Sequence, residues 1–409
     1  MQFYKLEKKK NSEIEYTPLI IMLITTMIII CIGGLMLYST TFHKSGASFL
    51  IKQAQWITLG TFGAISIIII GYKNLLRFKI PLFLLGISTI GLLWAKFLST
   101  PINGANRWIK TPLGNIQPSE YAKIALLLFM SWYCCKYIRH LNKWLDWKNK
   151  PYFIHKRGFL TANIIPAIIL VLILIGGDLG TTVLLFTALF AIYFLAGVRL
   201  ITLFSVPTVL ASAAFYAIVN WDPERLARLT TFLRIENNPI IQQGEGYQLW
   251  NSLLAIGSGG IYGAGYGESM MKLKYLPEAH TDFILAITAE EFGFLGFLFI
   301  IGIYTFFALS AITISIKSSS IQGKFLGAAI TIMILTQAII NIGVVSGAFP
   351  TKGMPAPMIS YGGSNMVSCL LGIGLLVSIA VEPKHDLIVK KVKYILGIIA
   401  RKISSIFAK

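Results

Sequence analysis

The chain is dominated by apolar runs of about 20 residues, the length that a helix needs to cross a bilayer. A backbone group left unpaired in lipid costs several kcal/mol, so spanning segments fold as helices or closed barrels. The short alternating segments of a barrel do not occur in the sequence. We therefore predict an all-α integral membrane protein of about ten transmembrane helices. They are expected near 18–40, 54–71, 78–98, 119–138, 159–175, 179–197, 200–220, 283–312, 325–348 and 364–381.

Composition supports this class and excludes others. Only 13% of the residues are charged and 55% are hydrophobic, whereas soluble domains average about 25% charged. No Walker lysine motif or Gly-rich dinucleotide fingerprint occurs, so ATP-driven pumping has no support. The four cysteines lie within or at the ends of predicted spans without metal-ligand spacing. Neither a disulfide framework nor a zinc site is expected.

Lysine and arginine residues indicate the orientation. Lys8-Lys9-Lys10 precede the first span, seven bases lie between Lys136 and Arg157, and seven more follow from Lys384 onward. Cytoplasmic segments carry such an excess, which predicts that both termini are cytoplasmic. The membrane domain is then 18–381, between an N-terminal tail 1–17 and a basic tail 382–409. A basic inner face against anionic lipid explains the net charge of +19 without nucleic-acid binding.

One long polar interval interrupts the spans. Residues 221–282 hold seven of the 17 acidic residues and end on Tyr275-Leu-Pro-Glu-Ala-His-Thr-Asp282. With this topology they form a large extracytoplasmic loop between the seventh and eighth helices. Arg225 and Arg228 could bind an anionic group, although solvated loop arginines are commoner. The glycines from Gly257 to Gly267 permit positive φ and close approach to a ligand, but flexible loops share this composition.

Asp282 is the sharpest catalytic candidate. It stands where the eighth span begins, beside His280, and partial desolvation there would raise its pKa and strengthen it as a base. The alternative is an N-cap of the eighth helix, and position alone does not separate the two. Two turns further in, we expect one of Glu290 and Glu291 to face the bundle interior. The other would pair with it or with a basic partner.

Two further carboxylates stand at predicted outer helix ends. Ser119 is a candidate N-cap of the fourth helix, and Glu120 and Lys123 share one face of it. They form either a mutually neutralising pair or a functional one, and the cost of ionisable groups in a membrane favours function. Asp178, in the turn before the sixth helix, is more simply an N-cap than a substrate ligand.

The segment from Phe349 to Ser364 contains three prolines and three glycines. This composition predicts a rigid re-entrant or surface loop rather than a helix. Lys352 within it could meet a phosphate. Ser360 in the same run is, like His280, a further candidate for substrate binding. The alternative is a plain connector between the last two spans.

Together these segments resemble the SEDS family (shape, elongation, division and sporulation proteins) over roughly residues 18–385. They are similar to its FtsW branch more than to its RodA branch, with SpoVE-type members as near relatives. The resemblance is carried by NGANRW, QPSEYAK, GDLGTT, GYQLWNSLLAIGSGG, YLPEAHTDFI, EEFG, PTKG and PxISYGGS, in the family's order. Two positions depart from the family pattern: Gly176-Gly177 replaces a Pro-containing turn before Asp178, and Asn251 replaces a Gln.

The resemblance implies a peptidoglycan glycosyltransferase that polymerises lipid II on the outer face of the bacterial cytoplasmic membrane, at the division septum. Asp282 matches the family's catalytic aspartate, and Glu120 and Lys123 match its polar pair in the central cavity. The partner implied is a class B penicillin-binding protein of the FtsI type, with other divisome proteins.

The leaving pyrophosphate needs cationic stabilisation. Candidates are Arg107, Lys123, Arg225, Arg228 and Lys352, or a divalent cation such as Mg²⁺ or Mn²⁺; no metal ligands can be named from the sequence. Two other functions stay open. A lipid II flippase would need a polar path through the bundle, and a divisome scaffold would activate its transpeptidase without chemistry of its own.

Overall fold

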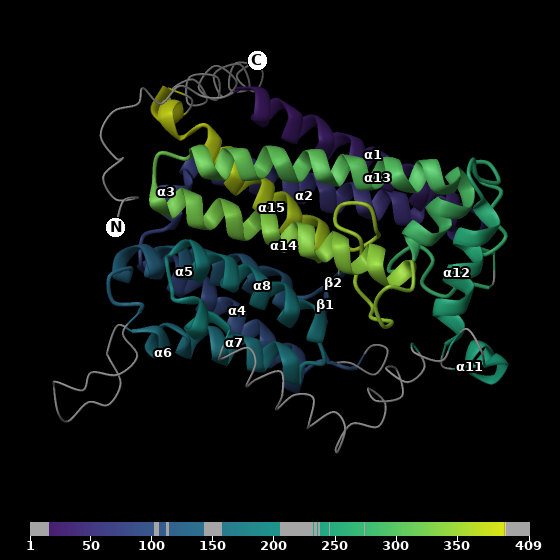
Figure 1. The fold of residues 1–409 in the computed structure, drawn as a ribbon, viewed down its shortest axis with the longest axis horizontal. Coiled ribbons are helices and arrows are strands. Elements are labelled where there is room, and N and C mark those ends of the chain that lie inside the picture. Colours follow the sequence, from purple (N-terminus) through teal and green to yellow (C-terminus); the bar gives the residue numbers. More distant parts are fainter. Residues whose placement is uncertain are drawn as a thin grey trace, which may run out of the picture.

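The computed structural model describes residues 16–101, 106–111, 114–142, 158–204, 238–244, 246–273 and 275–387, with residues 232, 235 and 389. Long helices lie side by side along the longest axis of the molecule (Figure 1). Their bounds are α1 Tyr16–Ser45, α2 Ser48–Ile70, α3 Tyr72–Leu75, α4 Lys79–Phe97, α5 Pro118–Tyr137, α6 Phe159–Ala162, α7 Ile164–Ile175, α8 Leu179–Leu195, α13 Ile284–Lys317, α14 Ile321–Val345 and α15 Gly363–Ala380. At one end of the bundle lie α11 (Pro239–Gln243), α12 (Tyr247–Gly259) and the hairpin β1–β2.

The predicted spans agree with these helices to within a few residues at most ends. In the described part of the chain, six helices are long and apolar enough to cross a membrane: α1, α2, α4, α13, α14 and α15. The apolar helices α7 and α8 are shorter. The predicted span 159–175 is divided at Asn163 into α6 and α7. Most of the predicted span 200–220 lies outside the described residues, so the count of ten stays a prediction.

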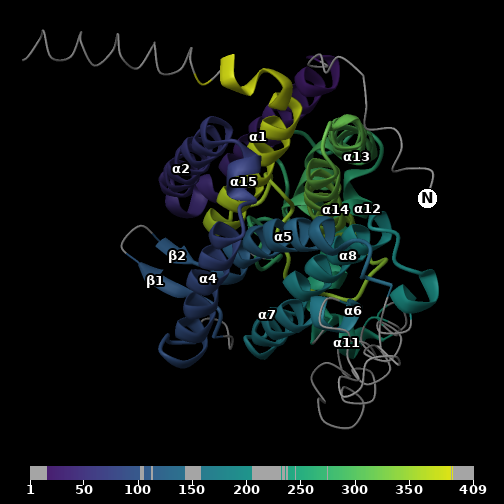
Figure 2. The ribbon, with the colours of Figure 1, turned by 90° about the vertical axis from the view of Figure 1, so that its left-hand side faces the viewer.

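Helix α5 is the central element. It contacts α4, α8, α14 and α15, and Figure 2 shows it in the middle of the bundle. Most of its residues are buried, with Ala122, Leu126 and Met130 at 0% exposed. A helix that is covered on all sides belongs to the core of a large helical protein. The first turn of α5 therefore carries its polar residues directly into the end of the bundle.

One element departs from the all-α prediction. Residues Ile109–Thr111 (β1) and Gly114–Ile116 (β2) form an antiparallel hairpin, with Ile109 opposite Ile116. Three-residue strands carry no signal on the scale of a membrane span, so the apolar pattern could not reveal them. The hairpin places Arg107 before it and Gln117 after it at the same end of the bundle.

Residues 346–362, between α14 and α15, form a loop that we call the buried loop. Ala356, Met358 and Ile359 are 0%, 1% and 1% exposed. A Cβ on Gly33, near the middle of α1, would lie 2.8 Å from the Cα of Ile359. The loop thus re-enters the bundle, as one of the two predicted alternatives has it, and Gly33 leaves the space for its backbone.

Helix α13 is broken at Gly293, where φ is 68° and ψ is −169°. The break frees main-chain groups on both sides of it, and the glycine-rich segment after α12 satisfies them. The N–H groups of Ala264 and Gly265 donate to the carbonyls of Glu290 and Glu291 at 2.9 and 3.1 Å. In return, Phe294 N–H donates to the Gly260 carbonyl at 2.9 Å. An unpaired backbone group at membrane depth is costly, so this exchange stabilises the break.

The glycines in this segment are required by close backbone contact. A Cβ on Gly259 would lie 2.1 Å from the Ala289 carbonyl oxygen, and one on Gly263 would lie 2.2 Å from that of Glu291. The predicted loop 221–282 is accordingly not a wholly solvated segment. In α12, Leu249, Ser252 and Ala255 are at most 1% exposed, and the helix packs on α13 and α14.

Replacing Gly263 by Ala should destabilise the protein. The new Cβ would meet the backbone of α13, and φ at this position is 85°, so the expected loss is about 1 to 3 kcal/mol from strain alone. Thermal unfolding of the purified protein measures it. Gly86→Ala is the matched control, because nothing lies within 4 Å of a Cβ there. An unchanged unfolding midpoint for Gly263→Ala would contradict the close packing.

Candidate active site

A cavity of about 940 Å³ opens at the end of the bundle where the hairpin and α12 lie. This volume is within the range of about 300 to 1,000 Å³ typical of ligand sites. Its walls come from the hairpin and its flanks, the first turns of α5 and α8, the turn before α13, and the buried loop. The charged and amide residues that line it are Arg107, Asn115, Gln117, Glu120, Asp178, Gln248, Glu278, Asp282, Gln337, Lys352 and Asn365.

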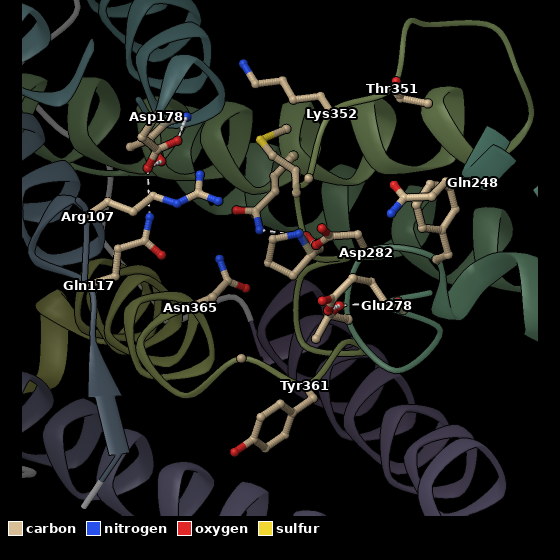
Figure 3. Close-up of a pocket in the computed structure, with 18 of the residues that line it drawn as sticks. Arg107, Gln117, Asp178, Gln248, Glu278, Asp282, Thr351, Lys352, Tyr361 and Asn365 are labelled. Carbon is tan, nitrogen blue, oxygen red and sulfur yellow. Dashed lines mark hydrogen bonds between the residues drawn. The ribbon is translucent and has the colours of Figure 1, made fainter. Parts of the chain in front are cut away.

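Asp282 forms part of the wall, on the turn that leads into α13 (Figure 3). The N-cap of α13 is Phe283, and no side chain caps the helix. The N-cap alternative for Asp282 is therefore wrong, and its carboxylate accepts no hydrogen bond from the described residues. The carboxylate lies against Gly353, where a Cβ would be 2.7 Å from its Oδ2.

The surroundings raise the pKa of Asp282 to about 7. Burial against protein is the main cause, the negative charge of Glu278 adds to it, and the positive charge of Arg107 opposes both. Glu278 lies on the same turn, in the left-handed conformation with φ of 54°, which is uncommon for a residue other than glycine. A carboxylate with a pKa near neutrality is suited to accept a proton.

The opposite wall centres on Asp178, which caps α8 as predicted. It accepts hydrogen bonds from the Thr181 N–H at 3.0 Å, from Gln117 Nε2 at 2.7 Å and from Ser119 Oγ at 3.0 Å. Ser119 is therefore not the N-cap of α5; that position is taken by Gln117, with Pro118 in the first turn. This network joins the starts of α5 and α8.

Arg107 lies between these two walls. Figure 3 shows its side chain extending from the neighbourhood of Asp178 toward the centre of the cavity. Its Nε is buried and has no hydrogen-bond partner among the residues that the structure describes. A guanidinium with an unused donor at a cavity wall can bind an anionic group.

Glu120 and Lys123 are joined, with 2.8 Å between Lys123 Nζ and Glu120 Oε2. The ammonium is close enough for an ion pair, but it makes no well-directed hydrogen bond to any described residue. Glu120 also accepts hydrogen bonds from Ser368 Oγ at 2.5 Å and Asn365 Nδ2 at 3.3 Å. Glu120 lines the cavity, whereas Lys123 is 0% exposed and does not. The prediction of Lys123 as a cavity residue that meets pyrophosphate is therefore wrong, because it lies beneath Glu120.

The remaining predicted substrate-binding residues differ in whether they line the cavity. Lys352 lines the cavity, but His280 and Ser360 do not. The His280 ring packs edge-on against Phe49 with centroids 5.0 Å apart, and Ser360 Oγ accepts the Ala356 N–H within the buried loop. Both have structural contacts in place of the predicted substrate contacts. Arg225 and Arg228 lie outside the described residues.

Glu290 and Glu291 are buried away from the cavity and hold the glycine-rich segment. Glu291 accepts from Lys272 Nζ at 2.7 Å and from Ser39 Oγ at 2.5 Å, so the predicted basic partner is Lys272. Glu290 accepts from the Ser269 hydroxyl and the Met270 N–H. These contacts reinforce the backbone exchange at the Gly293 break.

Sequence reasoning missed the neutral amides of the cavity. Four of them line it: Gln117, Gln248, Gln337 and Asn365. They were not predicted, because an amide side chain in a helix or loop is not unusual by itself. Gln117 and Gln248 lie within motifs quoted above, which was the available signal.

Comparison with known proteins identifies the family to which this chain belongs. Residues 16–385 match the model of the cell cycle protein family that comprises FtsW, RodA and SpoVE. The chain belongs to this family. A probable peptidoglycan glycosyltransferase FtsW of Trichlorobacter lovleyi is 34% identical over 368 residues, 88% of this chain and 92% of that protein. One of Coxiella burnetii is also 34% identical, over 93% of this chain and 100% of its own length.

Two solved structures share the fold. A chain from a peptidoglycan synthase complex that coordinates polymerization and crosslinking superposes with a TM-score of 0.68 at 22% identity, over 88% of this chain and 97% of that one. The rod shape determining protein RodA of Thermus thermophilus gives 0.62 at 22% identity, over 89% and 96%. At these identities the likeness establishes a multi-span membrane fold.

Replacing Lys123 by Met should leave the Glu120 carboxylate buried without its cation. Removing one partner of a buried pair costs about 3 to 5 kcal/mol, so the thermal unfolding midpoint should fall sharply. The double variant Glu120→Gln with Lys123→Met should recover most of the loss. Equal unfolding midpoints for the wild type and Lys123→Met would show that the pair is not buried as described.

Proposed function

We propose that this protein is a peptidoglycan glycosyltransferase of the FtsW type, which polymerises lipid II, with Asp282 as the general base. Membership of the family and the names of the relatives support the activity. The single observation that carries the catalytic assignment is the Asp282 carboxylate, which faces the cavity without a hydrogen-bond partner among the described residues and has a pKa near neutrality.

The reaction joins two lipid-linked sugars. The 4-hydroxyl of the acceptor sugar attacks the anomeric carbon of the donor, a carbon–oxygen bond forms, and the bond from that carbon to pyrophosphate breaks. A hydroxyl is a weak nucleophile, so Asp282 accepts its proton as the new bond forms. A single displacement inverts the anomeric centre, from an α-linked donor to a β-linked chain.

The departing pyrophosphate requires positive charge. Arg107, whose Nε has no partner in the described part of the chain, and Lys352 line the same cavity as Asp282. A divalent cation fits the arrangement as well, because Mg²⁺ is commonly held by one or two carboxylates together with substrate phosphates. Glu278, which lines the cavity, would supply such a carboxylate and would leave Asp282 to act as the base. No set of three His, Cys, Asp or Glu side chains suited to a metal occurs among the described residues.

The cavity end of the bundle is proposed to face the outside of the cytoplasmic membrane. Lys136, Lys317 and Lys384 lie in the last turns of α5, α13 and the short 3₁₀ helix Glu382–Lys384. For α5 and α13 these turns are at the end opposite Glu120 and Asp282, and basic residues favour the cytoplasmic side. The substrate's lipid tail would stay in the bilayer while its sugars enter the cavity. Action at the division septum follows from the FtsW type.

The proposed partner is a class B penicillin-binding protein of the FtsI type, acting with other divisome proteins. The complex whose chain shares this fold couples polymerization to crosslinking, which supports a transpeptidase partner. The flippase alternative gains little support, because along α5 the lining of the cavity reaches no deeper than Glu120. A scaffold without chemistry would not depend on Asp282.

Asp282→Asn should abolish glycan synthesis. The change keeps the shape of the side chain and removes the proton acceptor, and loss of general-base catalysis alone costs about 100- to 10,000-fold. The measurement is polymerisation of labelled lipid II by the purified protein with its transpeptidase. Glu268→Gln, an exposed carboxylate outside the cavity, is the control and should stay active. Product from Asp282→Asn would remove the base assignment.

The rate should rise with pH through about 7, because Asp282 must lose its proton to act as a base. Glu278→Gln removes a negative charge that raises the pKa of Asp282, so the acid limb of kcat/KM should move to lower pH. Arg107→Gln should move it to higher pH, because that cation lowers the same pKa. Initial rates across the neutral range test both shifts. If the acid limbs of the wild type, Glu278→Gln and Arg107→Gln lie at the same pH, a group other than Asp282 titrates.

A further inference from the structure

Two buried amide side chains on α14 face the buried loop. Gln337 and Asn341 are four residues apart, and hence on one face of the helix, and are 2% and 1% exposed. Gln337 Nε2 donates to the Pro355 carbonyl at 2.9 Å, and Asn341 Nδ2 donates to the Met354 carbonyl at 2.6 Å. The pair therefore attaches the cavity side of the buried loop to α14.

Asn341 differs from Gln337 in a second contact. Its Nδ2 also donates to the main-chain carbonyl of Asp282 at 2.8 Å. A side-chain amide has two N–H donors in one plane, and here both are used. The orientation of the amide is fixed, because turning it over would place Oδ1 against two carbonyl oxygens. Oδ1 itself is buried and has no hydrogen-bond partner within the described ranges of the chain.

A base with no hydrogen bond to its carboxylate has to be positioned in another way. Asp282 has none from the described residues, and its Oδ2 lies against Gly353, the residue before Met354. The place of the carboxylate thus depends on its own backbone and on this part of the buried loop. The side-chain amide of Asn341 holds both the Asp282 backbone and this part of the buried loop to α14.

We propose that Asn341 is a positioning residue for glycan synthesis, which sets the Asp282 backbone and the Gly353–Met354 segment at a fixed separation. The inference rests on the proposed function, in which Asp282 is the base. A displacement of about 1 Å at a reacting group can lower a rate about 100-fold. Loss of the amide should therefore lower kcat and leave the KM for lipid II nearly unchanged, because Asn341 does not line the cavity.

The test is the lipid II concentration dependence of polymerisation by the protein with its transpeptidase. Leu has the same number and branching of side-chain heavy atoms as Asn but no hydrogen-bond donors, so kcat of Asn341→Leu should fall at least tenfold. Gln337→Leu loses a contact to the same loop but none to Asp282, so its fall in kcat should be smaller. Ser252→Ala is the control for stability, since Ser252 Oγ donates to the Val345 carbonyl of α14 at 2.8 Å and does not contact Asp282. If Asn341→Leu does not fold, Asn341→Ser replaces it, with a single donor for two carbonyls.

The outcomes are distinct. Wild-type kcat in the folded Asn341 variant, or an equal fall in Ser252→Ala at matched loss of stability, would overturn the positioning role. A rise in KM with unchanged kcat would do the same. Asp282→Asn is measured alongside: if it still makes product, the base assignment fails. If it is inactive while the Asn341 variant is fully active, the proposed function stands and only the inference about Asn341 fails.

Discussion

The satisfaction of main-chain groups at the break in α13 is the constraint on which the site depends. Residues 294–317, beyond the break, extend about 36 Å at 1.5 Å per residue, enough to cross a hydrocarbon core of about 30 Å. The first turns of α13, from Ile284 to Phe292, are therefore free to belong to the cavity end of the molecule. They are held there by the glycine-rich segment, whose N–H groups donate hydrogen bonds to the carbonyls of Glu290 and Glu291.

This arrangement explains why buried carboxylates occur close to a catalytic candidate without sharing its role. Glu290 and Glu291 are paired with a hydroxyl, a backbone N–H and Lys272, so both carboxylates are engaged in contacts that stabilise the fold. Glu120 is similarly engaged by Lys123 and Ser368. Asp282 has no such partner among the described residues, and it is placed by its backbone, by Asn341 and by Gly353. A carboxylate that structure leaves unused is available for proton transfer.

The two walls of the cavity each carry a carboxylate, and the two carboxylates have different surroundings. Asp178 accepts hydrogen bonds from Gln117, Ser119 and the start of α8, while burial and Glu278 raise the pKa of Asp282. Arg107 lies between them. A substrate with a pyrophosphate and a sugar hydroxyl needs a cation for the first and a base for the second, and both are found within one cavity.

The sequence by itself determined the membrane class and most of the helix positions, and it singled out Asp282 as the candidate base. Length, apolarity and local motifs are properties of contiguous residues, and they survive without knowledge of the fold. Only the tertiary structure decided which polar residues meet. Lys123 and Ser360 are close in sequence to cavity residues but do not line the cavity themselves, whereas Asn341 contacts Asp282, which lies 59 positions away along the chain. Such contacts depend on how helices and loops pack against one another, which no local pattern records.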